Sequence, residues 1–267
     1  MKNKVTLPQL RQKKERGEKI VMLTCYDAPF AHLLEDSGVD ILLVGDSLGD
    51  NVLGYENTLP VTMEEMLHHT SAVHRGSNRP LLISDMPFMS YQVNVEEALK
   101  NAGRLVKEAG AEGVKLEGGE SAASAVCRIT NAGIPVMGHL GLTPQSVKIL
   151  GGYRVQGRDE KTAQRIIQDA KILEDAGAFA VVLELVPAEL ARHITEAISI
   201  PTIGIGSGAF CDGQVLVLHD MLGINPNRSL RHVHRYCEVG DIVKKAVSEY
   251  AEDVRSGSFP GTENSFN

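Results

Sequence analysis

The sequence contains no tryptophan, and aromatic residues make up only 4% of its 267 positions. Its four cysteines, Cys25, Cys127, Cys211 and Cys237, are widely separated and form no CxxC pair. A disulfide scaffold is short and rich in cysteine, and a structural zinc site needs clustered thiolates, so both classes are excluded. We therefore expect reduced thiols, which are typical of a cytoplasmic protein.

Long apolar segments and an excess of positive charge are also lacking. No apolar run reaches the roughly 18 residues of a membrane helix, and the N-terminus MKNKVTLPQLRQKKERGEK has no signal-peptide core. We therefore expect a cytoplasmic protein with no membrane partner. The 27 Lys and Arg residues stand against 34 Asp and Glu residues, a net charge of −7. This balance argues against nucleic acid as a partner, because a general nucleic-acid binder presents a basic face.

What the sequence does contain is a recurring unit in which a helix ends at glycine and a short apolar strand follows. In the three clearest copies, Gly38, Gly110 and Gly177 stand where a helix C-cap needs a left-handed residue. The Val-, Leu- and Ile-rich run after each glycine is continuous enough to be buried on both faces, as parallel strands are. Including weaker copies, about eight strands are expected, within 19–27, 36–47, 79–88, 108–119, 132–141, 174–186, 198–208 and 214–220.

Helical patterns separate these strands. They cover 27–36, 62–74, 95–108, 121–131, 161–175 and 187–197, and Thr62 and Glu65 form a capping box. Strands alternating with helices imply a parallel sheet with right-handed crossovers. A (β/α)8 TIM barrel needs about 250 residues, which fits this chain. An open doubly wound sheet is less favoured, because no GxGxxG follows the first strand.

Both ends of the chain add helices to this α/β pattern. Residues 1–18 contain an extra amphipathic helix over 6–18, which we expect to cover one end of the barrel with its charges solvated. Within 241–267, a helix over 241–255 ends at Gly257 and a tail follows. No linker divides the sequence, so we expect a single domain over 1–267.

Ionisable residues stand at the expected C-terminal ends of five strands, which is where the active site of such a barrel lies. They are Asp46 (followed by Ser47), Asp85, the pair Lys115 and Glu117, His139 and Glu184. Any one alone is explained by a helix cap or a loop hydrogen bond. The set favours a functional site, because buried charges persist only when they are paired or bound to metal.

This set of residues predicts a specific chemistry. Asp46, Asp85 and Glu117 would form a ring of oxygen ligands suited to Mg2+. A 2-oxo acid chelates Mg2+, and the metal stabilises the charge that develops when the neighbouring carbon loses a proton. Lys115 can hold the substrate carboxylate, and Glu184 is left as the general base. We therefore predict enolate chemistry on a small 2-oxo acid.

A glycine-rich segment, GIGSG at 204–208, follows the seventh strand. Many barrels bind phosphate on backbone amides at this place. A tight turn with close backbone packing explains the segment equally well.

Several motifs resemble those of the ketopantoate hydroxymethyltransferase family. They run in order between Leu23 and Leu222 and include LTCYDAPFA (23–31), LLVGDSLG (42–49), SDMPFMSY (84–91), VKLEGG (114–119), GHLGLTPQS (138–146), GGYRVQGR (151–158) and LELVP (183–187). The resemblance implies a (β/α)8 barrel that assembles as a homodecamer. It also implies transfer of a hydroxymethyl group from 5,10-methylenetetrahydrofolate to 3-methyl-2-oxobutanoate, giving 2-dehydropantoate in the first step of pantothenate biosynthesis.

The resemblance also implies residue roles. The Mg2+ ligands of the family match Asp46, Asp85 and Glu117. Its substrate-binding positions match Asp46, Ser47, Asp85, Lys115 and His139. Its proton acceptor matches Glu184.

The sequence departs from the family pattern at Asp50 and Asn51, in segment 225–239 and in the tail at 264–266. These departures bear on folate affinity and subunit contacts. One rival class is the Mg2+-dependent barrels of the phosphoenolpyruvate-mutase and isocitrate-lyase kind, whose Cys-containing loop, such as KKCGH, is absent here. The other is a catalytically inactive binding or scaffold barrel, which would gain nothing from several carboxylates repelling one another at its mouth.

Overall fold

The computed structural model describes residues 3–225 and 230–266 of the chain. It contains two compact units, Met1–Leu216 and Val217–Asn267. The single domain expected over 1–267 therefore stays a prediction. Within the described residues, none of the helices combines the length and apolar character needed to cross a membrane.

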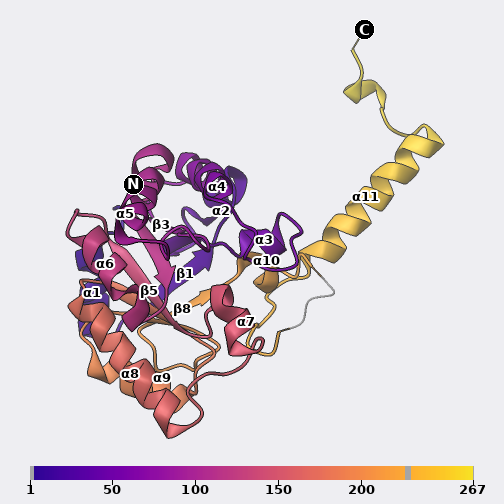
Figure 1. Ribbon diagram of the computed structural model, residues 1–267. Helices are drawn as coiled ribbons and strands as arrows, with labels where there is room; N and C mark the ends of the chain where they lie inside the picture. The colour runs from indigo at the N-terminus through magenta and orange to yellow at the C-terminus, as the bar shows by residue number, and fades with distance from the viewer. Residues whose placement is uncertain (1–2, 226–229, 267) are drawn as a thin grey trace. The chain divides into compact units, whose positions relative to one another are not determined.

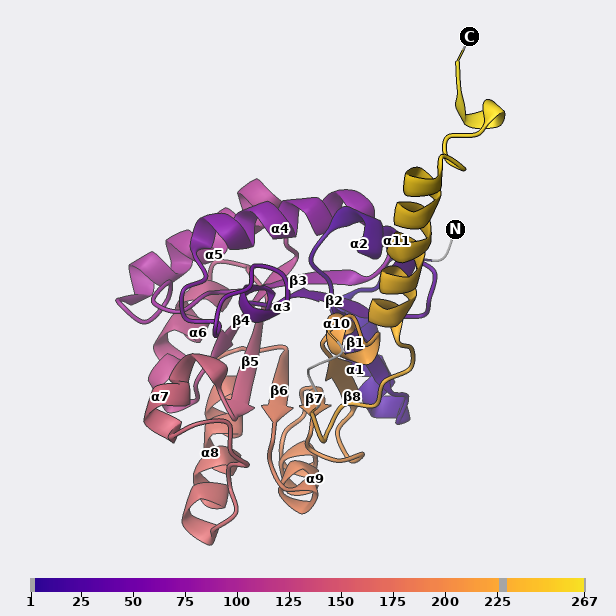
Figure 2. The same ribbon diagram turned by 90° about the vertical axis from the view of Figure 1, so that its right-hand side faces the viewer.

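The first unit is a closed barrel of eight parallel strands in sequential order, with β8 pairing with β1. The strands are β1 (Ile20–Thr24), β2 (Ile41–Val44), β3 (Leu81–Asp85), β4 (Gly113–Glu117), β5 (Val136–Gly141), β6 (Ala180–Glu184), β7 (Thr202–Ile205) and β8 (Gly213–Leu216). Helices surround the strands on the outside (Figures 1 and 2). The predicted (β/α)8 barrel with an extra N-terminal helix is confirmed.

The predicted helices are confirmed with small shifts at their ends. They are α1 (Leu7–Arg16), α2 (Ala28–Leu34), α4 (Met63–Gly76), α5 (Val95–Ala109), α6 (Ala123–Thr130), α8 (Glu160–Asp175) and α9 (Ala188–Ala197). Short helical turns that were not predicted lie in the loops after the strands, namely α3 (Leu48–Asn51), η1 (Glu120–Ala122), η2 (Pro144–Ser146) and α7 (Val147–Leu150). The predicted capping box of α4 forms, since Thr62 N donates to Glu65 Oε2 and Glu65 N to Thr62 Oγ1.

The prediction for the eighth strand is wrong at its end. The apolar run predicted a strand over 214–220, but β8 ends at Leu216 and Leu218–Met221 form the short helix α10. An apolar run of this length does not distinguish a strand from the start of a helix, so the pattern alone overextends the strand.

Side chains along each strand alternate between two apolar layers, one inside the barrel and one between the sheet and the helices. Inside, the buried Ile83 lies two residues before Asp85 on β3. Likewise, Val182 lies two residues before Glu184 on β6. Each fully buried apolar side chain stabilises the fold by roughly 1.5–3 kcal/mol. The interior therefore changes from apolar to ionisable toward the C-terminal ends of the strands.

Helix α1 covers the N-terminal end of the barrel, as predicted. Its Leu10 is 1% exposed and belongs to the inner apolar layer. Lys13 Nζ contacts Asp40 Oδ2 at 2.7 Å, and the same oxygen accepts from Val21 N at 2.9 Å. Asp40 lies directly before β2 and Val21 is in β1, so this ion pair connects the helix to two strands.

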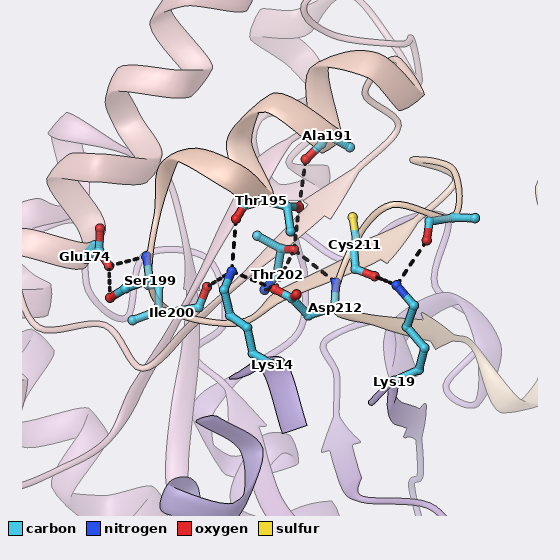
Figure 3. A network of polar contacts seen from close by, with 11 residues as sticks. Lys14, Lys19, Glu174, Ala191, Thr195, Ser199, Ile200, Thr202, Cys211 and Asp212 are labelled. Carbon is cyan, nitrogen blue, oxygen red and sulfur yellow. Dashed lines mark hydrogen bonds and ion pairs between the residues drawn. The ribbon is translucent and has the colours of Figure 1, made fainter. Parts of the chain in front are cut away.

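Lys14 connects α1 to the opposite side of the same end. Its Nζ lies 2.9 Å from Asp212 Oδ2 and donates at 3.0 Å to the main-chain oxygens of Thr195 and Ile200. Asp212 also accepts from Thr202 N, at the start of β7 (Figure 3). The expectation that the α1 charges are solvated is therefore wrong for Lys13 and Lys14, because their long side chains reach acceptors beneath the strands.

The second unit contains α10, α11 (Val239–Ser256) and a short 3-10 turn, η3 (Thr262–Asn264). Helix α11 confirms the predicted C-terminal helix and ends at Gly257, whose φ of 76° gives the left-handed C-cap. Its exposed apolar residues include Val243, Val247, Tyr250 and Val254. Of the divergent segment 225–239, residues 226–229 lie outside the described part of the chain.

Candidate active site

The ionisable residues predicted from the sequence meet at the C-terminal ends of β2–β6. Asp85 ends β3 and lies opposite Lys115 on β4, while Glu117 lies opposite His139 on β5. Asp46 follows β2 in the chain, and its main-chain N donates to Asp85 Oδ2 at 3.0 Å. Contacts between neighbouring strands thus bring together residues that are far apart in the sequence.

Lys115 lies at the centre of this group. Its Nζ is 3.0 Å from Asp85 Oδ1 and 3.2 Å from His139 Nδ1, and its side chain is only 6% exposed. Burial disfavours the charged form, but Asp85, Glu117 and Asp46 outweigh it and raise the pKa of Lys115 above its usual range. Lys115 therefore stays protonated and is available to hold an anionic group.

Negative charge exceeds the charge that Lys115 can neutralise. Burial, with repulsion from Asp85 and Glu117, raises the pKa of Asp46 well above its usual range. Burial also raises the pKa of Asp85, although Lys115 acts in the opposite direction. The site would therefore be stabilised by an additional positive charge.

His139 connects two carboxylates. Its Nδ1 lies 3.4 Å from Glu117 Oε1 and its Nε2 lies 3.1 Å from Glu184 Oε2. Burial and Lys115 disfavour the imidazolium, but the close carboxylates of Glu117 and Glu184 raise the pKa of His139 to about 9. The side chain of Glu184 is 17% exposed, against 4% for Glu117 and His139. Glu184 is therefore the carboxylate with the readiest access to a substrate.

Ser47 lies beside Asp46 and contacts the aromatic residue that follows β1. Its Oγ is 2.8 Å from the hydroxyl of Tyr26. The unexpected Asn51 donates from Nδ2 to the main-chain oxygen of Ser47 at 2.8 Å. Asn51 therefore stabilises the turn that positions Asp46 and Ser47 rather than interrupting it.

Backbone conformation also shapes the site next to Glu184. Leu185, the following residue, has a φ of 46°, which is uncommon for a residue with a branched side chain. Gly141 at the end of β5 has a φ of 91°, and a Cβ there would meet the main-chain oxygen of Glu184 at 2.2 Å. The fold thus requires glycine at this position so that β5 can approach the end of β6.

Two uncharged residues in the site were not predicted from the sequence. Gln145, from η2 after β5, donates from Nε2 to Asp46 Oδ2 at 2.8 Å and from its main-chain N to Glu117 Oε2 at 3.0 Å. Tyr91, after β3, donates from its hydroxyl to Gln145 Oε1 at 2.8 Å. Neither side chain carries charge at neutral pH, and neither lies at the end of a strand. The pattern of ionisable residues at strand ends therefore does not predict them. Their position within the quoted motifs SDMPFMSY and GHLGLTPQS was the available signal.

The arrangement of the carboxylates bears on metal binding. Among the described residues, no three or more His, Cys, Asp or Glu side chains are already grouped around one metal position. Protein N–H groups contact oxygens of all three predicted ligands, Asp46, Asp85 and Glu117. The donor chemistry nevertheless suits a hard divalent cation, because three buried carboxylates share one lysine.

The GIGSG segment (204–208) forms the end of β7 and a packed turn after it. Ser207 is 1% exposed, and its Oγ donates to Leu183 O at 2.7 Å and accepts from Val186 N at 3.3 Å. These bonds tie the turn to the end of β6. They support the close-packing explanation for this segment.

The sequence matches the ketopantoate hydroxymethyltransferase profile over residues 4–262. The chain belongs to the ketopantoate hydroxymethyltransferase family. It is 58% identical to the 3-methyl-2-oxobutanoate hydroxymethyltransferase of Carboxydothermus hydrogenoformans, over 99% of this chain and 96% of that protein. It is also 58% identical to the enzyme of the same name from Syntrophus aciditrophicus, over 98% and 97% of the two chains. Family membership makes the chain a transferase.

Solved structures share the barrel at much lower identity. A phosphonopyruvate hydrolase has a TM-score of 0.63 and 13% identity, with 97% of this chain and 93% of that chain covered. A 2,3-dimethylmalate lyase of the phosphoenolpyruvate-mutase and isocitrate-lyase superfamily has a TM-score of 0.60 and 14% identity, over 98% and 91% of the chains. The rival class considered from the sequence thus has the same fold, and the likeness extends to the fold alone.

Proposed function

We propose that this chain transfers a hydroxymethyl group from 5,10-methylenetetrahydrofolate to 3-methyl-2-oxobutanoate, giving 2-dehydropantoate in the first step of pantothenate biosynthesis. The observation that carries the proposal is the buried Lys115 beside carboxylates, with the more accessible Glu184 joined to them through His139. This arrangement provides a cation for an anionic substrate and a base for its neighbouring carbon. The names of relatives at 54–58% identity support the same reaction.

Each residue then has a defined task. Lys115 holds the carboxylate of the 2-oxo acid through charge-assisted hydrogen bonds, and Ser47 donates a further hydrogen bond. Glu184 accepts the proton from C3, leaving the electron pair on the substrate as an enolate. His139, which contacts Glu184, holds that carboxylate in place. Water hydrolyses the methylene bridge of the folate, so that tetrahydrofolate leaves and formaldehyde remains. The enolate carbon bonds to the formaldehyde carbon, and the resulting alkoxide takes the proton held by Glu184 to complete the hydroxymethyl group.

We propose Asp46, Asp85 and Glu117 as the residues that hold Mg2+. Their negative charge exceeds the charge of Lys115, and the raised pKa of Asp46 records the mutual repulsion. When bound, Mg2+ would supply positive charge to the keto oxygen of the substrate. Lys115 and the N–H donors would then share the carboxylates with the cation.

We also propose that the protein acts in the cytoplasm and assembles as a homodecamer. The four cysteines are free, which agrees with a reducing compartment. Self-association is supported by α11, whose exposed Val243, Val247, Tyr250 and Val254 follow helical spacing. Sedimentation equilibrium tests the assembly, and a monomeric mass at micromolar concentration would contradict it.

Proton NMR of 3-methyl-2-oxobutanoate in D2O tests the enolisation step. We expect the enzyme to exchange the C3 proton with Mg2+, and EDTA to abolish the exchange. Glu184→Gln should slow exchange by about 10²–10⁴-fold, the usual contribution of a general base. The exposed Glu196 on α9 offers a matched control, and Glu196→Gln should exchange at the wild-type rate.

Adding tetrahydrofolate and formaldehyde completes the test. We expect 2-dehydropantoate to form only when the folate is present. Exchange without product would support the enolisation step and reject folate as the donor. Absence of both exchange and product would favour the inactive-barrel alternative.

A further inference from the structure

Gln145 contacts the carboxylate group through two different nitrogen atoms. Its side-chain Nε2 donates to Asp46 Oδ2 at 2.8 Å, and its main-chain N donates to Glu117 Oε2 at 3.0 Å. The residue is 6% exposed. One loop residue thus holds a carboxylate from the loop after β2 and another from the end of β4.

The two oxygens of each carboxylate have different kinds of partner. Gln145 holds Oδ2 of Asp46 and Oε2 of Glu117, and the main-chain N of Asp46 holds Oδ2 of Asp85 at 3.0 Å. One oxygen of each carboxylate is therefore bound to an uncharged N–H. The second oxygen of Asp85 lies next to Lys115, and that of Glu117 lies next to His139.

The orientation of the Gln145 amide is determined by its neighbours. Nε2 also donates to the main-chain oxygen of Met86 at 3.0 Å, and that oxygen can only accept. On the other side, Oε1 accepts from the Tyr91 hydroxyl at 2.8 Å and from Gln92 Nε2 at 3.2 Å. If the amide were flipped, its oxygen would face the main-chain oxygen of Met86 and the carboxylate oxygen of Asp46, and neither contact would have a hydrogen between the two oxygens. The N–H donor therefore has to face Asp46.

We propose that Gln145 is a positioning residue, which holds one oxygen of Asp46 and one of Glu117 so that Asp46 Oδ1 and Glu117 Oε1, the oxygen beside His139, face the cation and the 2-oxo acid. Tyr91 supports it by holding the amide oxygen. This inference rests on the proposed function, because it assigns a role within that site. Gln145 acts through Asp46 and Glu117 and is not assigned a contact with the reacting atoms.

Gln145→Met tests the proposal, because methionine has similar length and shape but no amide. We expect the dissociation constant for Mn2+, measured by EPR titration with 3-methyl-2-oxobutanoate present, to rise about 10–100-fold, as for other residues that orient metal ligands. The KM for the oxo acid should rise with it. At saturating Mn2+ and substrate, kcat should fall by less than about threefold, because Glu184 is untouched.

A second variant and a control keep the test decisive if Gln145→Met folds poorly. Tyr91→Phe removes the hydroxyl that holds Oε1 and that also accepts from the main-chain N of Glu117 at 3.1 Å. It should raise the Mn2+ dissociation constant in the same direction by a smaller factor. Gln164→Met, at an exposed position on α8, should leave the Mn2+ dissociation constant, KM and kcat unchanged.

Unchanged Mn2+ affinity in both Gln145→Met and Tyr91→Phe would overturn the inference, and so would a wild-type protein that binds no Mn2+. A loss of kcat at saturating Mn2+ with unchanged affinity would overturn it too. Failure of the proposed function looks different. In that case the wild-type protein binds Mn2+ but exchanges no C3 proton, and the effect of Gln145→Met on affinity is still measured.

Discussion

The two ends of the barrel use buried charge in opposite ways. At the N-terminal end, acids and lysines are paired: Asp212 has Lys14 at 2.9 Å and Asp40 has Lys13 at 2.7 Å. Both acids also accept a main-chain N–H, from Thr202 and Val21 respectively. The charges at this end are balanced, and they hold α1 against the strands.

At the C-terminal end the charges do not balance. Four carboxylates, those of Asp46, Asp85, Glu117 and Glu184, share two cations, Lys115 and His139, whose pKa is raised to about 9. The pKa values of Asp46 and Asp85 are raised by burial. The apolar layers and hydrogen bonds of the fold hold these carboxylates together against their repulsion. Since the same residue types form balanced pairs at the other end, the imbalance is a property of this site. Under the proposed function, stability is given up there so that a cation and an anionic substrate can bind.

The largest expected effect follows from removing the central cation of the site. Lys115→Met should reduce turnover of 3-methyl-2-oxobutanoate by about 1000-fold, because a buried, hydrogen-bonded charge pair loses one partner. The same substitution at Lys14 should leave turnover per folded molecule unchanged. Initial rates, normalised to the folded fraction from circular dichroism, measure both. Equal losses in the two variants would remove the distinction between the two ends.

The next effect concerns stability. Lys14→Met should lower the free energy of unfolding by about 3 kcal/mol, because it leaves the partly buried Asp212 and two main-chain oxygens without their cation. Urea denaturation measures this loss. Lys161→Met, at an exposed position on α8, should change stability by less than about 0.5 kcal/mol. If Lys14→Met proved as stable as wild type, the contacts of Lys14 would be incidental to the attachment of α1.

This comparison also explains which features could be predicted from the sequence. Strand ends carry a strong signal, since an apolar run followed by Asp85 or Glu184 locates both the strand and its polar end. The barrel and its ionisable group followed from that pattern. The resemblance to a known family added the roles of Ser47 and His139.

Other features depend on contacts that no local pattern encodes. Gln145 and Tyr91 occupy loops, and their importance comes from oxygens far away in the sequence, 99 residues away for Asp46 Oδ2 and 54 residues away for Gln145 Oε1. The partners of Lys14 are more distant still, 181–198 residues further along the chain. From the sequence alone, a helix rich in charged residues is interpreted as solvated, because the sequence does not show that acceptors lie at the N-terminal end of the barrel.

A third effect tests whether the imbalance is relieved by metal. Mg2+ at about 100 times its dissociation constant should stabilise the wild-type protein by about 2.7 kcal/mol relative to EDTA, through binding to the folded state alone. Asp85→Asn should reduce that gain, because a carboxylate of the group is lost. Urea denaturation with Mg2+ and with EDTA measures both. An equal gain in Asp85→Asn would exclude Asp85 as a ligand.

The smallest expected effect is a change in the free energy of unfolding when one Asp is replaced by Asn. It tests the comparison most directly, because we expect opposite signs at the C-terminal and N-terminal ends of the barrel. In EDTA at pH 8, Asp46→Asn should stabilise the protein by about 1 kcal/mol, since asparagine removes a repelled charge. Asp40→Asn, at the balanced end, should instead destabilise it, because Lys13 loses its partner.

The pH dependence of the Asp46 effect follows from linkage. The raised pKa of Asp46 means that the folded state holds this proton more tightly than the unfolded state. Its contribution to stability is therefore complete below the ordinary value of 3.8 and is lost as pH rises toward the folded-state value. The gain from Asp46→Asn should accordingly be larger at pH 8 than at pH 5, as urea denaturation at each pH would show. A loss of stability in Asp46→Asn at pH 8 would mean that the carboxylates of the site are as well matched as Asp40, and the imbalance would then no longer indicate a binding site.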